Sequence, residues 1–159
     1  QQMSEPWRRL FDLAVAGLAL VVLSPILLIC AVAVKLTSRG PVLYRQSRVG
    51  RDGADFEVLK LRTMVDGAEH KGAGLAVDRG DSRITTVGRV LRRSGLDEIP
   101  NLVNVLRGEM SMVGPRPERP EFVLQLAEKV PGYLERLSIM PGITGLSTPW
   151  PRIDSTRSK

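Results

Sequence analysis

The sequence has very few of the side chains that form disulfides or bind transition metals. Cys30 is the single cysteine and His70 the single histidine among 159 residues. One cysteine excludes a disulfide scaffold and a cysteine-rich zinc site, and one histidine excludes a histidine-based metal cluster. Any chemistry must therefore rest on carboxylates, arginine, lysine and hydroxyl groups.

Aromatic residues are also scarce, at 4%, although the chain is basic, with a formal net charge of +6. A basic chain suggests nucleic-acid binding, but the aromatic platforms on which bases stack are few. Hydrophobic residues make up 43%, which excludes a disordered chain. The length fits one domain, and we expect no nucleic-acid partner.

One segment is apolar enough for a membrane. Residues 13–34 carry no charged side chain. As a helix rising about 1.5 Å per residue they would extend roughly 33 Å, the thickness of a bilayer's hydrocarbon core. No small-residue cleavage site follows, so a signal peptide is not favoured. The segment predicts a helix associated with a membrane.

Ser24 and Pro25 interrupt this run at its middle. Proline lacks a backbone donor, so the helix must bend there, and the Ser24 hydroxyl can bond a carbonyl that the bend frees. Arg8 and Arg9 precede the run and Lys35 follows it. Because positive residues favour the cytoplasmic side, a bent re-entrant helix satisfies both ends. The residues alone leave this alternative and a kinked spanning helix open.

Three charged residues before the run are candidates for the membrane interface. Arg8 and Arg9 can bind lipid phosphates. Asp12 lies four and three residues after them, which predicts an ion pair with one of them on one helix face. Together with Ser24 and Pro25, these residues form the predicted membrane and headgroup contact.

The remainder predicts a small, mostly helical unit with a β-hairpin. Strand patterns over residues 42–46 and 56–62 flank a Gly-rich turn at 50–53. Residues 66–82 suggest a mobile loop. Apolar residues at helical spacing predict helices at four places: from near Thr85, from Leu96–Asp97 to Gly108, from about Pro120 to Lys129, and from Tyr133 to Leu137. Ser94, three residues before Asp97, fits the N-cap of the second of these helices.

Asp97 and Glu98 are the residues best suited to chemistry. They follow Arg92 and Arg93 and fall in the first turn of a predicted helix, where the positive helix end favours ionised carboxylates. A carboxylate can attack phosphorus, and Mg²⁺ binds one or two carboxylates together with substrate phosphates. Acids in a first helical turn also simply stabilise helices, so a structural role stays open.

Arginines recur along the chain in positions suited to anions. Their guanidinium groups match phosphate oxygens in pairs. Arg116 lies between two prolines, which restrain its backbone. A solvated basic face is the alternative. The set comprises Arg45, Arg48, Arg62, Arg92, Arg116 and Arg119.

Several runs occur together and in order. They are Arg9–Asp12, Leu23–Pro25, Gly40–Val42, Arg45–Gly50, Lys60–Met64, Asp81–Thr85, Leu91–Leu102, Asn104–Ser111, Val113–Pro117 and Pro141–Gly145. In this combination the chain resembles the bacterial sugar transferase family, the monotopic polyprenyl-phosphate phosphoglycosyl transferases, over about residues 7–145.

The resemblance implies an α+β enzyme with an N-terminal re-entrant membrane helix, broken at Ser-Pro, on the cytoplasmic face of the bacterial inner membrane. Such enzymes transfer a sugar 1-phosphate from a nucleoside-diphosphate sugar, such as a UDP-sugar, to polyprenol (undecaprenyl) phosphate. This reaction initiates exopolysaccharide, O-antigen or capsule synthesis. The implied division is a membrane helix at 1–39, a catalytic domain at 40–145 and a loose tail at 146–159.

The resemblance also implies roles for individual residues. Asp97 would be the nucleophile that forms a covalent phosphosugar intermediate, and Glu98 would help to hold Mg²⁺ or orient the site. Both carboxylates are thus the implied metal ligands. Four cations would bind substrate phosphates: Lys60, Arg62, Arg92 and Arg116.

The tail departs from the family pattern. After Gly145 the family continues with a longer amphipathic segment carrying aromatics, whereas here Leu146–Trp150 follows and the sequence ends at Lys159. The alternative function is therefore a truncated, catalytically inactive membrane-anchored remnant or scaffold of the family. The sugar, the glycan pathway and the presence of homo-oligomers stay open.

Overall fold

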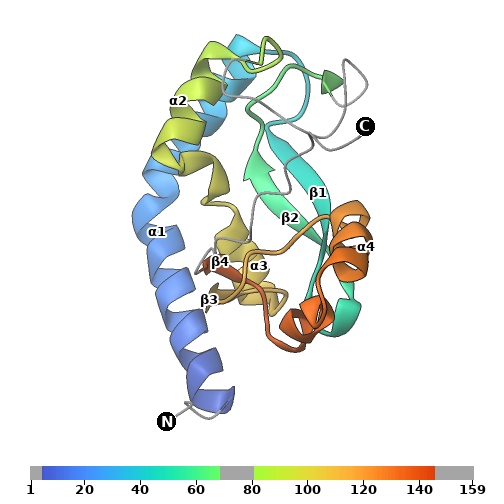
Figure 1. The fold of residues 1–159 in the computed structure, drawn as a ribbon. Helices are drawn as coiled ribbons and strands as arrows, with labels where there is room; N and C mark the ends of the chain where they lie inside the picture. Colours follow the sequence, from blue (N-terminus) through green and yellow to red (C-terminus); the bar gives the residue numbers. More distant parts are fainter. Residues whose placement is uncertain (1–4, 69–80, 146–159) are drawn as a thin grey trace, which may run out of the picture.

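The computed structural model describes residues 5–68 and 81–145 (Figure 1). The helices are α1 (Glu5–Thr37), α2 (Thr86–Ser94), α3 (Asn101–Arg107) and α4 (Pro120–Lys129), with 3₁₀ turns η1 (Arg51–Gly53), η3 (Leu96–Glu98) and η4 (Tyr133–Ser138). The strands are β1 (Leu43–Val49), β2 (Asp55–Leu61), β3 (Ser111–Val113) and β4 (Gly142–Thr144). The expected α+β class, with a long apolar helix and a β-hairpin, is confirmed.

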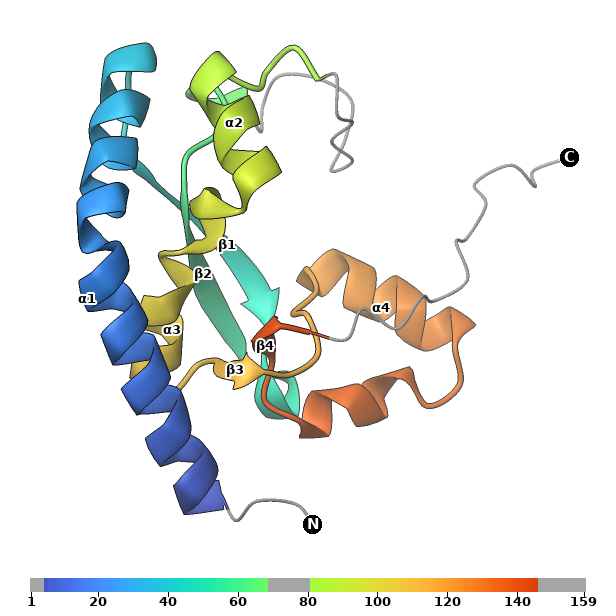
Figure 2. The same cartoon turned by 90° about the vertical axis from the view of Figure 1, so that its left-hand side faces the viewer.

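Helix α1 runs along one side of the molecule, and α4 with η4 lies on the opposite side (Figures 1 and 2). One stripe of α1 packs inward. Ala16 is buried against α3 and β2, and Cys30 and Val34 are buried against α2 and the end of β2. Both halves of the apolar run therefore contribute to the hydrophobic core.

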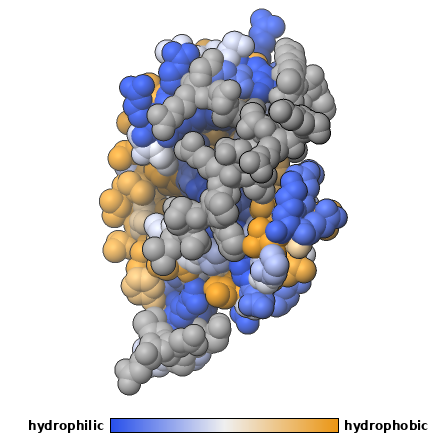
Figure 3. Space-filling model, in the orientation of Figure 1, coloured by the Kyte–Doolittle hydropathy of each residue, from blue (hydrophilic) through white to orange (hydrophobic). Residues whose placement is uncertain are grey.

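The opposite face of α1 exposes large apolar side chains, among them Leu18, Val21, Leu28 and Ile29. Figure 3 shows this face as a hydrophobic band at the left edge of the molecule. Residues Pro6–Thr37 are long and apolar enough to cross a membrane, by length and composition alone.

The helix continues through Pro25 as one element of 33 residues. The Ser24 hydroxyl donates a hydrogen bond of 2.8 Å to the Val21 carbonyl. That carbonyl lies four residues before Pro25 and is the one left without a helical donor by the proline ring. The expected hydrogen bond is confirmed. The freed carbonyl therefore has a donor, and the residues on both sides of Pro25 belong to one helix.

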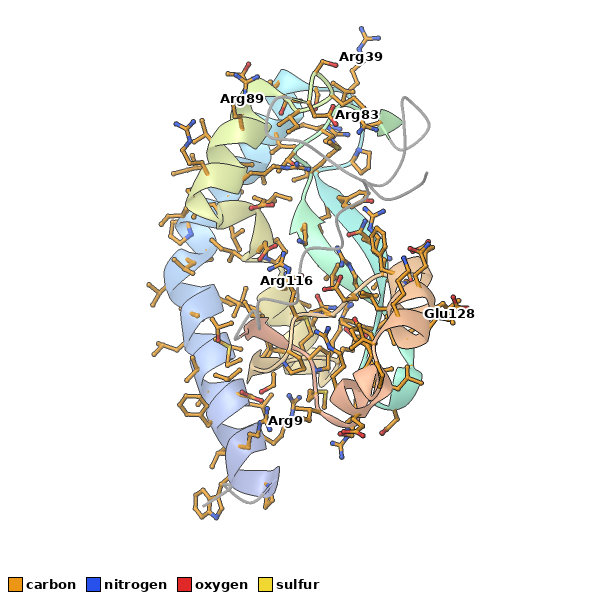
Figure 4. All side chains as sticks on the ribbon, viewed as in Figure 1. Arg9, Arg39, Arg83, Arg89, Arg116 and Glu128 are labelled. Atoms are coloured by element: carbon orange, nitrogen blue, oxygen red, sulfur yellow. The ribbon has the colours of Figure 1, made fainter. Side chains whose placement is uncertain are left out.

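The charged residues at the start of α1 contact the rest of the fold. Asp12 is buried and accepts a hydrogen bond from the Met112 backbone N–H, and Arg8 donates to the Val113 carbonyl. Arg9 donates to two carbonyls at the end of α3, and Figure 4 shows it pointing that way. The predicted pair between Asp12 and an arginine is wrong: within the described ranges no ion pair joins them, because packing brings backbone partners closer.

Strands β1 and β2 form the predicted antiparallel hairpin, in register from Leu43 opposite Leu61 to Val49 opposite Asp55. Asn104 of α3 is fully buried and forms hydrogen bonds with the backbone of β2 in this hairpin. Its side chain accepts from the Leu59 N–H and donates to the Glu57 carbonyl. The hairpin therefore has a fixed position relative to α3.

The helix expected to begin at Leu96–Asp97 begins later. Ser94 is the last residue of α2, and its hydroxyl donates to carbonyls of the preceding turn, so the N-cap prediction is wrong. Gly95 ends α2 with a φ of +73° and leads into the 3₁₀ turn η3. Pro100 then caps α3. The glycine reverses the chain there, so two short elements replace one helix.

The parallel pair of β3 and β4 had no sequence signal. Ser111 lies opposite Gly142 and Val113 opposite Thr144. A Cβ atom on Gly142 would collide with the backbone of Gly114, so only glycine permits this close crossing. The other elements lie near their expected places. Most of the expected loop, including His70, and the expected tail fall outside the described residues.

Candidate active site

The 3₁₀ turn η3 carries both acidic candidates. Asp97 is directed inward and is 9% exposed. Burial raises the pKa of the Asp97 carboxyl, since removal from water penalises its charged form, and the positive charge of Lys60 acts in the opposite direction. Asp97 is therefore a carboxylate shielded from water, beside a cation.

Glu98 is held by two cations from distant parts of the chain. Its Oε1 accepts from Lys60 Nζ at 2.7 Å and from Arg116 Nη2 at 2.6 Å. Burial by itself would raise the pKa of Glu98, but the hydrogen bonds from Arg116 and Lys60 lower it to about 2. Figure 4 shows Arg116 between the helices and the hairpin. Glu98 thus stays ionised, and its ion pairs connect Lys60 of β2 with Arg116 of the segment 115–117.

The two adjacent carboxylates therefore have opposite environments. The pKa of Asp97 is raised by burial, whereas that of Glu98 is lowered by two direct cationic partners. Neighbouring acids whose pKa values diverge have separate tasks in many enzymes. The geometry suits Asp97 for attack on an electrophile and Glu98 for holding the cations around it.

A cavity of about 460 Å³ opens beside these acids. Asp97 and Glu98 line it together with five cationic side chains: Arg48, Lys60, Arg92, Arg116 and Arg119. This excess of positive charge suits a ligand with several negative charges, such as a diphosphate. The structure thus brings three of the four predicted phosphate ligands, Lys60, Arg92 and Arg116, to the predicted acids.

Arg92 reaches the cavity from α2. Its Nε donates to the Thr63 hydroxyl at 2.8 Å. Gly88, one turn earlier on α2, packs against the Thr63 backbone so closely that a Cβ would collide with the carbonyl. Arg92 is therefore held at a defined distance from the chain that follows β2.

Arg62 lies apart from the acids. Only 6% of it is exposed, and its Nη2 donates to the backbone carbonyl and to the hydroxyl of Ser38, just after α1. It lines a second cavity, of about 260 Å³, beside Pro41 and Tyr44. Its assignment to a substrate phosphate stays a prediction, as do the headgroup roles of Arg8, Arg9, Asp12, Ser24 and Pro25, which do not line the cavity at Asp97.

One face of β1 adds Tyr44 and Gln46, which the sequence analysis did not single out, beside Arg48, which it named as a candidate for anions. Tyr44, Gln46 and Arg48 line the cavity. Arg48 donates to the Gln46 side chain at 2.7 Å and to the Pro117 carbonyl at 3.0 Å. Burial and the nearby charge of Arg119 lower the pKa of Arg48. Alternation along the strand would have found this set, since its members are two residues apart.

The donor chemistry limits how a metal could bind. Among residues 5–68 and 81–145 no group of three or more acidic, histidine or cysteine side chains lies together. Asp97 and Glu98 are two carboxylates, and Lys60 and Arg116 already occupy one oxygen of Glu98. These residues fit a Mg²⁺ ion that takes its other ligands from water and from substrate phosphates.

Comparisons with known proteins show which family the chain belongs to. The family model for bacterial sugar transferases matches residues 3–154. The chain is 45% identical over 141 residues to the UDP-glucose:undecaprenyl-phosphate glucose-1-phosphate transferase of Caulobacter vibrioides, a match that covers 88% of this chain and 52% of that protein. It is 44% identical over 138 residues to a UDP-N-acetylgalactosamine-undecaprenyl-phosphate N-acetylgalactosaminephosphotransferase of Aeromonas hydrophila, covering 87% of this chain and 32% of the relative.

A third relative is the exopolysaccharide production protein PSS of Rhizobium leguminosarum, which is 43% identical over 145 residues. The match covers 88% of this chain and 72% of that protein. The chain thus spans about half of the Caulobacter relative and about a third of the Aeromonas relative. The family model, by contrast, matches nearly the whole of this chain. The chain belongs to the bacterial sugar transferase family.

Proposed function

We propose that this chain transfers a sugar 1-phosphate from a nucleoside-diphosphate sugar to polyprenol phosphate at the cytoplasmic face of a bacterial inner membrane, and so initiates a glycan. The observation that carries the proposal is the buried carboxylate of Asp97 in a cavity lined by five cations. A diphosphate donor needs such a cationic lining, and a covalent route needs such a nucleophile. The names of the relatives favour a UDP-sugar and undecaprenyl phosphate.

In the first step an oxygen of Asp97 attacks the phosphorus that bears the sugar. A bond forms between that oxygen and phosphorus, and the bond from this phosphorus to the bridging oxygen breaks. The nucleoside monophosphate leaves with the bonding electrons. Arg116 and Lys60, both held by Glu98, lie where they can stabilise the negative charge that develops on the diphosphate.

In the second step a phosphate oxygen of polyprenol phosphate attacks the same phosphorus. The bond to Asp97 breaks, the carboxylate is regenerated, and the product is a polyprenyl-diphosphate sugar. A bound Mg²⁺ would neutralise diphosphate charge, with Asp97 and the less occupied oxygen of Glu98 as its protein ligands. The raised pKa of Asp97 makes it a better nucleophile than an exposed carboxylate once ionised.

The packing of α1 supports a helix that enters the membrane without crossing it. Inward contacts occur at both ends, from Arg9 at the N-terminal end to Val34 at the C-terminal end. A spanning course would pull one of these ends away from α2 or α3. The exposed apolar face can instead enter one leaflet while the inward stripe stays on the domain. The re-entrant course is part of this proposal.

The activity is tested by the release of nucleoside monophosphate. The full protein, purified in detergent, is given undecaprenyl phosphate, Mg²⁺ and a panel that includes UDP-glucose and UDP-N-acetylgalactosamine. We expect release from at least one donor, dependent on lipid and metal, and its loss in Asp97→Asn. Glu57→Gln, at an exposed position on β2, is the matched control and should keep the activity. No release by folded protein from any donor contradicts the proposal and favours the inactive remnant.

The topology is tested by labelling. In a Cys30→Ser background, single cysteines replace Pro6 and Thr37 at the two ends of α1. A membrane-impermeant maleimide should label both positions in inverted vesicles and neither in intact spheroplasts. Labelling of one end from each side would show a spanning helix.

A further inference from the structure

The first turns of α1 hold a short strand at the other end of the sequence. Asp12 is 5% exposed, and its Oδ1 accepts a hydrogen bond of 3.0 Å from the Met112 backbone N–H in the middle of β3. One turn earlier, Arg8 donates to the Val113 carbonyl at 2.7 Å and reaches the Ser111 hydroxyl at 3.4 Å. A buried carboxylate that lost this donor would lie in an apolar surrounding without compensation, so the contact is costly to break.

Strand β3 leads directly to Arg116. Gly114 follows it at the tight crossing with Gly142, and the Gly142 N–H donates to the Pro115 carbonyl at 3.0 Å. The Arg116 side chain then extends to Glu98 at 2.6 Å. Prolines on either side of Arg116 restrict its backbone, so less of a shift of β3 is absorbed before it reaches the guanidinium.

The segment is also held from its other side. Arg136 of η4 donates to the Arg116 carbonyl at 2.9 Å, and Arg48 donates to the Pro117 carbonyl. These contacts come from η4, on the side of the molecule opposite α1, and from the end of β1. The segment thus lies between two supports, and the end of the membrane helix supplies one of them.

We infer that Asp12 is a positioning residue for Arg116: the end of the membrane helix sets, through β3, where this cation meets the diphosphate. This rests on the proposed function for the role of Arg116. It gives Asp12 a task other than headgroup binding. It also links the seating of α1 on the domain to the geometry of the cavity.

A double-mutant cycle tests the coupling. Asp12→Ala should lower kcat/KM for the donor about tenfold, the effect expected when a hydrogen bond to a charged group is lost. In an Arg116→Ala background the same substitution should lower it less than about twofold, because there is no cation left to misplace. In an Arg92→Ala background, the matched control, Asp12→Ala should still lower kcat/KM about tenfold. Equal losses in both backgrounds would overturn the inference.

Asp12→Asn separates positioning from charge. Asparagine keeps an acceptor oxygen for the Met112 N–H but lacks the negative charge. Positioning predicts that Asp12→Asn retains most of the wild-type kcat/KM, whereas a role of the charge predicts a loss like that of Asp12→Ala. A loss of that size in the asparagine variant would overturn the inference.

Hydrogen exchange tests the same contact without activity. In full-length protein in detergent, Asp12→Ala should speed amide exchange at least tenfold in peptides covering 111–117, and Asp12→Asn should not. Peptides covering α2 should be unchanged by either substitution. Unchanged exchange over 111–117 in Asp12→Ala would overturn the inference. Faster exchange over 111–117 in Asp12→Ala, combined with a wild-type protein that shows no turnover, would instead mark failure of the proposed function alone.

Discussion

Replacement of Glu98 by glutamine should destabilise the protein through loss of one charge. The carboxylate accepts from Lys60 Nζ at 2.7 Å and from Arg116 Nη2 at 2.6 Å, and its side chain is only 26% exposed. These bonds hold the pKa of Glu98 at about 2, against a reference value of 4.5. Glutamine keeps the shape but cannot form the ion pairs.

The size of the effect follows from the pKa. A difference between 4.5 and about 2 corresponds to about 3 kcal/mol, at roughly 1.4 kcal/mol per pH unit. Since the Arg116 side chain is 53% exposed, solvent weakens its share, and about 2 kcal/mol is expected at pH 7. Because the folded pKa is the lower one, this stability is complete above pH 4.5 and is lost as the pH falls toward 2. At pH 3 less than half should remain.

Urea unfolding of the detergent-solubilised protein at pH 7 and pH 3 measures this difference. Wild type should exceed Glu98→Gln by about 2 kcal/mol at pH 7 and by less than half of that at pH 3. Glu57→Gln is the matched control. Its ion pair with Arg45 is 3.5 Å long, with both side chains at least 60% exposed, so no measurable change is expected. A Glu98→Gln effect that is the same at both pH values would refute the reasoning.

Three further predictions concern Asp97, the proline in α1 and the packing of α2. Burial raises the pKa of Asp97, so nucleotide release should rise with pH through a value above 3.8 and then level off; a profile flat down to pH 4 would contradict this. Ser24→Ala should lower the free energy of unfolding by about 1 kcal/mol, but not in a Pro25→Ala background, where the new N–H serves the same carbonyl; calorimetry of the four proteins checks it. Gly88→Ala should lower the melting temperature by several degrees, since its methyl group would meet the Thr63 carbonyl, whereas Gly17→Ala, with open space around it, should not.

Much of the secondary structure follows from local pattern. The bounds of α4 agree with the prediction because Pro120 at its start and Lys129 in its last turn are strong local signals. The hairpin agrees because its strands pair across a short turn. The pair of β3 and β4 could not be predicted, because each strand has three residues and they lie about thirty residues apart. Strands this short show no alternation.

The sequence predicted the two acids of the candidate site but not the arrangement of the residues around them. Asp97 and Glu98 stand out as adjacent carboxylates, yet nothing local reveals that one is buried and the other held by Lys60 and Arg116. Those partners are 38 and 18 residues away from Glu98. Spacing on one helix suggested an arginine partner for Asp12, whereas tertiary packing brought a backbone N–H one hundred residues away.

The position of η3 connects the membrane helix to the proposed chemistry. This turn joins α2 to α3, and both helices pack against α1. Asp97 therefore lies in a turn whose two flanking helices both contact α1. In the proposed topology, the outer face of α1 enters one leaflet, and this places the site at the membrane surface. A polyprenol phosphate, with its chain in the bilayer, can meet Asp97 there without leaving the membrane.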